Sequence, residues 1–228
     1  LDIAVGHAAE HVGDVDAVTI STAIPPTNPE VVVARERGVP VLRRADALAA
    51  IAGTRRTIAV AGTHGKTTTS SMLALVLIEA GLQPSFIIGG DVNEIGTGAV
   101  WDQGEWFVVE ADESDGTFLE LGAEVAIVTN IEPDHLEHYG SYEALLDAFA
   151  RFLTEASGPR VVCADDGTAA RVGRAAGAVT YGFAEDADYR LVDAVVERNG
   201  TTFALRHEGA DLGRVHLPVP GRHNALNA

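Results

Sequence analysis

The segment GTHGKTTT, residues 62–69, constrains the fold of this chain more than any other, because it lies between an apolar run and a helical pattern. The apolar run, residues 57–61, predicts a buried strand, and residues 66–80 predict a helix. Glycine at positions 62 and 65 allows backbone N–H groups to converge on one anion at the positive end of that helix. A strand, a glycine-rich turn and a helix in this order are typical of a phosphate-binding loop.

The loop also contains the single lysine of the chain, Lys66; the other 15 of the 16 basic residues are arginine. A compact ammonium group at this position can reach the β- and γ-phosphates of a nucleotide, and the Thr67 hydroxyl can ligate Mg²⁺. The loop is shorter than the usual P-loop, since Val60 stands where that pattern has its first glycine. A turn without a ligand is the alternative, but the lysine and the threonines that follow it favour phosphate binding.

The charge balance restricts the partners of the chain. It has 33 acidic and 16 basic residues, a formal net charge of −17, which repels nucleic acids and anionic membranes. The longest apolar run, residues 72–78, is too short to span a bilayer, so we expect no membrane insertion. The single cysteine, Cys163, excludes a disulfide framework and a zinc cluster of thiolates within the chain. We expect a cytoplasmic protein.

The pattern of apolar segments predicts an α/β fold. Residues 106–110 and 125–130 are continuous apolar runs, as in a parallel sheet covered on both faces. Asn199-Gly200 between two extended segments predicts a hairpin. We expect a partial Rossmann-like N-terminal domain in residues 1–54, and in residues 55–228 a P-loop-type ATPase domain with a mainly parallel sheet and a small antiparallel element.

Two further strands end in polar segments. VVEADESD, residues 108–115, contains the acidic residues Glu110, Asp112, Glu113 and Asp115, which would form either a cation site or a solvated turn. TNIEPDHLEHYGS, residues 129–141, contains Asn130, Asp134, His135 and His138, which could bind a metal or a substrate or could form an ordinary turn before a capped helix. Because ligands of open α/β sheets bind at the carboxyl ends of the strands, we expect both segments to meet the phosphate loop.

Several of these motifs, taken together and in order, resemble the Mur ligases, which build the peptide of peptidoglycan. The resemblance lies in AGTHGKTTTSSM, IIGGDVNEIG, EADESDGTFL, TNIEPDHLEHYGS and PGRHNALNA, and STAIPPTNPE and VPVLRRADALA resemble the second half of the family's N-terminal domain. The chain is similar in particular to the alanine-adding members. The resemblance implies a three-domain enzyme that uses ATP and Mg²⁺ to join L-alanine to the carboxylate of UDP-N-acetylmuramate through an acyl phosphate.

The resemblance also implies roles for particular residues. Lys66, Glu110 and His135 would be catalytic, with Thr67 and Glu110 on one Mg²⁺ and His135 on a second. The implied nucleotide-binding residues are Gly62, Thr63, His64, Gly65, Lys66, Thr67, Thr68, Asn224 and Asn227. The implied substrate-binding residues are Ser21, Thr22, Ala23 and Asn130. Some Mur ligases bridge the metals with a carbamylated lysine, and this chain has no lysine except Lys66, so that role is absent or another group fills it.

The glycine-rich start of the family's UDP-binding domain and its C-terminal domain, where most of the amino-acid pocket lies, are not among these 228 residues. We therefore expect the chain by itself to lack turnover, and its oligomeric state is left open. One alternative is the recycling ligase that attaches a tripeptide to the same sugar nucleotide, although that enzyme tends toward tyrosine at the position of Ser114. A second alternative is a non-catalytic nucleotide-binding module. A third is an unrelated P-loop kinase or GTPase, and the short loop and the absence of an NKxD motif disfavour this third alternative.

Overall fold

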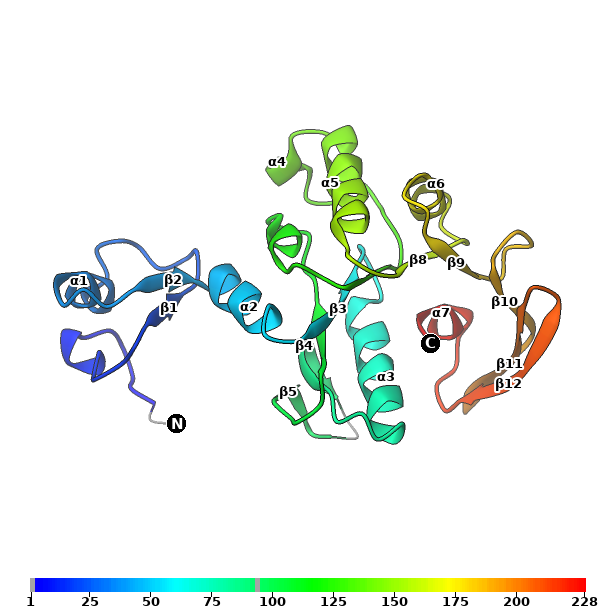
Figure 1. The fold of residues 1–228 in the computed structure, drawn as a ribbon, viewed down its shortest axis with the longest axis horizontal. Helices are drawn as coiled ribbons and strands as arrows, with labels where there is room; N and C mark the ends of the chain where they lie inside the picture. The colour runs from blue at the N-terminus through cyan, green and yellow to red at the C-terminus, as the bar shows by residue number, and fades with distance from the viewer. Residues whose placement is uncertain (1–2, 93–94) are drawn as a thin grey trace. The chain divides into compact units, whose positions relative to one another are not determined.

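The computed structural model describes residues 3–92 and 95–228, which divide into two compact units, Leu1–Ile51 and Ala52–Ala228. Figure 1 colours the chain from its N-terminus to its C-terminus. Asn93 and Glu94, in the middle of the IIGGDVNEIG motif, lie outside the described residues. Along the two described stretches, every helix is too short or too polar to cross a membrane.

The first unit contains a small βαβ arrangement. Strand β1 (Val18–Ile20) pairs in parallel with β2 (Val41–Arg43), and α1 (Pro29–Glu36) connects them. Helix α1 begins at Pro29 because the Asn28 side chain accepts a hydrogen bond of 2.9 Å from the backbone N–H of Glu30 and proline follows Asn28, a combination that is typical of a helix start. The short 3₁₀ helix η1 (Ala9–His11) precedes β1, and α2 (Arg44–Ala52) follows β2.

The described part of the second unit contains one ten-stranded sheet. In spatial order its strands are β12 (Ala210–Leu217), β11 (Gly200–His207), β10 (Tyr189–Glu197), β9 (Val179–Gly182), β8 (Arg160–Cys163), β7 (Val125–Val128), β3 (Arg56–Ala61), β6 (Trp106–Glu110), β4 (Ser85–Val92) and β5 (Thr97–Val100). The seven strands from β10 to β4 are mutually parallel, and the antiparallel pairs lie toward the two edges. The predicted mainly parallel α/β fold is confirmed.

Helices cover both faces of this sheet. Helix α3 (Lys66–Glu79) packs on β3, β4 and β6, and α5 (Tyr142–Glu155) packs on β7 from the opposite side (Figure 1). Ser141 caps α5, since its hydroxyl accepts a 3.1 Å hydrogen bond from Ala144 N–H. Helix α6 (Gly167–Ala175) packs on β8 and β9. The central strand β3 is buried over its last five residues, which explains why its sequence is apolar without alternation.

The small antiparallel element expected at the C-terminal end is an extension of the main sheet. The predicted hairpin of β10 and β11 forms, but its two turn residues are Arg198 and Asn199, because Gly200 already pairs with Glu197 as the first residue of β11. Strand β10 also pairs in parallel with β9 and so continues the main sheet. Strand β9 and helix α6 have no clear signal in the sequence, and without β9 the hairpin has no neighbouring strand to pair with. At the other edge, β4 and β5 were also not anticipated, because two glycines, Gly89 and Gly90, interrupt the apolar pattern of β4.

Candidate active site

The loop after β3 has the backbone conformation that its glycines predict. Gly62 has a φ of 130° and Gly65 a φ of 85°, both in the left-handed region that favours glycine. A Cβ on Gly62 would lie 2.2 Å from Thr129 Oγ1, and one on Gly65 would lie 2.4 Å from Asn227 Oδ1. Gly65 stands at the N-cap of α3, where no side chain caps the helix. The N–H groups of the first turn therefore remain available to an anion.

The segment after β7 holds this loop in place. The Asn130 side chain makes two 2.8 Å hydrogen bonds with the backbone of His64, accepting from its N–H and donating to its carbonyl. Thr129 Oγ1 also donates to the His64 carbonyl, over 2.6 Å, and Thr63 Oγ1 accepts from Glu132 N–H over 2.9 Å. Both ends of the Asn130 amide are thus engaged with the loop, and its contact with substrate stays a prediction.

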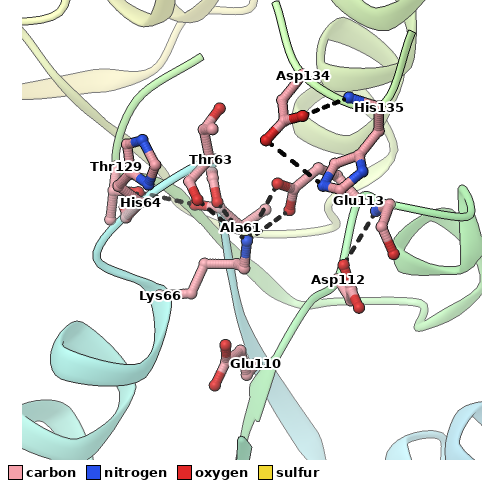
Figure 2. Close-up of polar contacts among 12 residues, drawn as sticks. Ala61, Thr63, His64, Lys66, Glu110, Asp112, Glu113, Thr129, Asp134 and His135 are labelled. Atoms are coloured by element: carbon pink, nitrogen blue, oxygen red, sulfur yellow. Dashed lines mark hydrogen bonds and ion pairs between the residues drawn. The ribbon is translucent and has the colours of Figure 1, made fainter. Parts of the chain in front are cut away.

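Lys66 begins α3, and its ammonium turns back over the loop. Nζ donates to the Gly62 carbonyl over 2.7 Å and lies 2.9 and 3.1 Å from the two carboxylate oxygens of Glu113 (Figure 2). Glu113 is only 2% exposed, so this ion pair is formed away from bulk water. The role of Glu113 is not evident from the acidic segment of the sequence, because the order of residues in a turn does not show which carboxylate points inward.

Thr67 and Glu110 meet beside this ion pair. The Thr67 hydroxyl is 3.0 Å from each Glu110 carboxylate oxygen, and Gly89 N–H donates to Glu110 Oε2 over 2.8 Å. A Cβ on Gly89 would lie 2.9 Å from Glu110 Oε2, so the glycine permits this close approach. A hydroxyl and a carboxylate in contact are oxygen donors of the kind that Mg²⁺ prefers. The described residues contain no group of three or more His, Cys, Asp or Glu side chains arranged to hold a metal by themselves.

The remaining acidic side chains of the segment stabilise its turn. Asp112 Oδ1 accepts from Ser114 N–H over 3.0 Å, and Asp115 Oδ1 accepts from the Thr117 N–H and hydroxyl over 3.1 and 2.6 Å. The acidic segment therefore divides: Glu110 and Glu113 face the phosphate loop, while Asp112 and Asp115 form local turn contacts. The sequence left open whether the four residues form a cation site or a solvated turn, and neither description fits all four.

His135 lies at the N-cap of the short helix α4 (Leu136–Tyr139), with a φ of 53°. Its backbone N–H donates to Asp134 Oδ1 over 2.8 Å, and its Nε2 is 3.7 Å from Asp134 Oδ2. Within the part of the chain that the structure describes, no hydrogen bond or ion pair joins His135 to Thr67 or Glu110. Imidazole is also a softer ligand than Mg²⁺ prefers. The second metal site at His135 therefore stays a prediction.

Tyr139, at the end of α4, connects that helix to the acidic segment. Its hydroxyl donates a short hydrogen bond to the Glu113 carbonyl. Burial, together with the negative charges of Glu113, Asp115 and Asp112, raises the pKa of the Tyr139 phenol to about 12. The phenol therefore remains a neutral donor at physiological pH. The segments after β3, β6 and β7 are thus connected to one another, as expected from their strand order β7-β3-β6.

The other predicted residues are distributed as follows. Asn227, in helix α7 (Arg222–Asn227), lies against Gly65 and is brought to the loop. Asn224 Nδ2 donates to the Pro220 carbonyl over 2.8 Å, a contact within its own segment. Thr68 lies in the first turn of α3. Ser21, Thr22 and Ala23 lie in the first unit, after β1, where Ser21 Oγ accepts from Ala23 N–H over 3.2 Å.

Comparisons with known proteins find relatives over nearly the whole chain. Residues 60–228 match the Mur ligase middle domain, and residues 1–56 match the Mur ligase family, catalytic domain. The UDP-N-acetylmuramate–L-alanine ligase of Acidothermus cellulolyticus is 51% identical over 233 residues, which cover 99% of this chain and 49% of that protein. The chain therefore spans about half the length of this relative.

Two solved structures have the same fold. The UDP-N-acetylmuramate–alanine ligase of Thermotoga maritima superposes with a TM-score of 0.84 at 31% identity, covering 98% of this chain and 51% of that one. The UDP-N-acetylmuramate:L-alanyl-gamma-D-glutamyl-meso-diaminopimelate ligase of Neisseria meningitides superposes with a TM-score of 0.80 at 27% identity, covering 97% and 74%.

Proposed function

Because this chain belongs to the Mur ligase family, we propose that it forms the nucleotide-binding part of an ATP-dependent ligase that joins L-alanine to the carboxylate of UDP-N-acetylmuramate. The observation that carries the proposal is identity of 51% across 99% of the chain to a relative with that name. Such a ligase supplies a precursor of peptidoglycan and would act in the cytoplasm, where ATP is available.

The chemistry explains why the site is built around positioned charge. A carboxylate is a poor acyl donor, since its oxygen does not leave readily. Attack of a carboxylate oxygen on the γ-phosphorus of ATP forms an acyl phosphate and releases ADP. The amine of L-alanine then attacks the acyl carbon, and phosphate leaves from the tetrahedral intermediate. Because ATP and the carboxylate are both anions, the protein must hold them together and offset their charge.

We assign the predicted residues to these tasks. Lys66 and the N–H groups of residues 66–68 in the first turn of α3 would hold the phosphates, supported by the uncapped start of α3 and by the inward position of the ammonium. The N–H groups of Thr63 and His64 are already bonded to Asn130, so these two residues would shape the loop around the nucleotide. Thr67 and Glu110 would hold Mg²⁺, because their oxygens already meet at 3.0 Å. Bound Mg²⁺ would supply neutralisation of phosphate charge. His135 would contact the second cation beside the acyl group.

The remaining residues are assigned to the adenine base of ATP and to the UDP-linked sugar substrate. Asn227 and Asn224 would contact adenine from α7, which the proximity of Asn227 to Gly65 supports for the first of them. Residues 1–54 would form part of the UDP-binding domain, with Ser21, Thr22 and Ala23 facing the diphosphate and Asn130 contacting substrate in the second unit. Residues 55–228 would form the ATPase domain.

The proposal is tested by phosphate release from ATP in the full-length protein. We expect release only when UDP-N-acetylmuramate and L-alanine are both present. The assay is run in parallel with glycine, L-serine and the tripeptide L-alanyl-γ-D-glutamyl-meso-diaminopimelate. Equal turnover with the tripeptide would identify the recycling ligase instead. Nucleotide binding without turnover on any amine would identify a non-catalytic module.

A further inference from the structure

Glu113 differs from the other carboxylates of the acidic segment in its burial and its partner. Its side chain is 3% exposed, and among the described residues its carboxylate hydrogen-bonds with the ammonium of Lys66, at 2.9 and 3.1 Å. Placing a carboxylate away from water is costly unless a cation compensates it. The burial of the Glu113 charge therefore depends on the ammonium of Lys66.

The backbone around Glu113 is fixed from two directions. Its carbonyl accepts hydrogen bonds from the Tyr139 hydroxyl and, over 3.2 Å, from the Gly116 N–H. The preceding residue, Asp112, caps the turn by accepting from Ser114 N–H. Since these contacts fix the main chain on both sides of the side chain, the Glu113 carboxylate stands at a defined position relative to the loop.

The ammonium of Lys66 has three N–H donors, and its contacts are unequal. The shortest is with the Gly62 carbonyl at 2.7 Å, and the two Glu113 carboxylate oxygens follow at 2.9 and 3.1 Å, whereas the Thr63 carbonyl lies at 3.5 Å, the limit of a hydrogen bond. These contacts fix the position of Nζ. When one donor is shared between the two Glu113 oxygens, the third donor is available to a phosphate oxygen without loss of the contacts with Gly62 and Glu113.

We propose that Glu113 is a positioning residue for Lys66: it holds the ammonium over the phosphate loop so that one donor is directed at the transferring phosphoryl group. This inference rests on the proposed ligase function. Glu113 itself does not touch ATP or the cation. It restrains a long side chain with several rotatable bonds, so the lysine does not have to be ordered anew in each catalytic cycle.

The contrasting possibility is that the pair serves folding alone. In that case removal of the Glu113 charge would lower stability but leave the turnover of the folded protein unchanged. A positioning role gives a different result, because the lysine keeps its charge and its attraction for phosphate while it loses its defined place. The turnover number then falls, whereas KM for ATP stays the same or decreases.

The test compares the wild-type full-length protein with Glu113→Gln, which has nearly the same shape and no charge. We expect kcat to fall at least tenfold, with KM for ATP and the Kd of ADP changed less than threefold, all values being normalised to folded protein. Asp188→Asn is the control. Asp188 lies between β9 and β10, and its carboxylate accepts hydrogen bonds from the N–H and hydroxyl of Thr180 in β9, so we expect kcat to be unchanged.

A stability cycle with Lys66→Ala tests the pairing itself. We expect Lys66→Ala to lower Tm, because it leaves Glu113 buried without its cation, and we expect the double variant Lys66→Ala/Glu113→Gln to recover part of that loss. The inference would be overturned if Glu113→Gln shifted Tm equally in the wild-type and Lys66→Ala backgrounds. It would also be overturned if Glu113→Gln left kcat unchanged while the wild-type protein is active. Neither result would affect the proposed ligase function. An inactive wild-type protein in the same assay would overturn the proposed function and this inference with it.

Discussion

The side-chain amide of Asn130 and the backbone of His64 form a closed pair of hydrogen bonds, each 2.8 Å long. Asn130 follows β7 and His64 belongs to the loop after β3, so this pair fastens the phosphate loop to the neighbouring strand exit. Such an arrangement makes the loop conformation depend on a residue outside the loop sequence.

Replacing Asn130 with alanine should therefore loosen the loop. Two hydrogen bonds are lost, and the His64 N–H loses its acceptor, so we expect unfolding to become easier by about 1–3 kcal/mol. KM for ATP should rise in parallel, because the backbone N–H groups lose their fixed direction. Thermal unfolding and steady-state kinetics measure the two effects. An unchanged KM beside a lowered Tm would show that the loop is ordered by its other contacts.

Thr67→Val tests the proposed magnesium site. The substitution keeps the branched shape of the side chain but removes the hydroxyl that meets Glu110, so we expect the Mg²⁺ concentration for half-maximal activity to rise about tenfold, equivalent to ~1.4 kcal/mol. Thr69→Val is its control, since Thr69 lies in the same helix and its buried hydroxyl has no hydrogen-bond partner among the described residues. A magnesium titration of phosphate release in both variants gives the comparison. The same shift in both would argue against Thr67 as a ligand.

Gly62→Ala should damage the protein more than Gly81→Ala. Both glycines have positive φ, 130° and 74°, so each alanine carries a backbone penalty of roughly 1–2 kcal/mol. Only at Gly62 does the new Cβ also collide, 2.2 Å from Thr129 Oγ1, while nothing lies within 4 Å of the Cβ position at Gly81. Chemical denaturation of the two variants measures the difference. Equal losses would mean that Thr129 moves aside at no cost.

The raised pKa of Tyr139 predicts a pH dependence of stability. A phenol whose pKa is about 12 when folded and about 10 when unfolded favours the folded state below pH 10, and this contribution is lost as the pH rises toward 12. Tyr139→Phe cannot ionise, so its stability should fall less steeply than that of the wild type between pH 10 and 12. Burial also raises the pKa of Tyr181, which remains in both proteins and cancels in the comparison. Denaturant unfolding at a series of pH values provides the measurement, and parallel curves would contradict the expectation.

Local signals in the sequence account for much of the fold. Helix α1 begins after Asn28 because an asparagine cap followed by proline determines a helix start within a few residues. The three polar segments come together because β7, β3 and β6 are adjacent and parallel, so their carboxyl ends share an edge. Cys163 is buried, as its place in an apolar strand indicates.

Features that depend on tertiary contacts could not be predicted in this way. The direction of the Glu113 side chain depends on the turn that Asp112 and Tyr139 stabilise, and a list of neighbouring acids does not contain that information. Strand β4 contains Gly89, which is unfavourable for a strand in isolation, but the glycine admits the Glu110 carboxylate. The order of β9 and β10 in one sheet likewise follows from pairing across the chain rather than from local pattern.

The contact between Gly65 and Asn227 has a kinetic consequence. It joins the start of α3 to the last helix, and the sheet strands from β4 to β12 are synthesised between them. Contacts between residues so distant in sequence form late, because closing a long chain segment costs entropy that earlier contacts must offset. During refolding, nucleotide binding should therefore return only after the secondary structure has formed. We expect ADP binding to recover later than the circular dichroism signal.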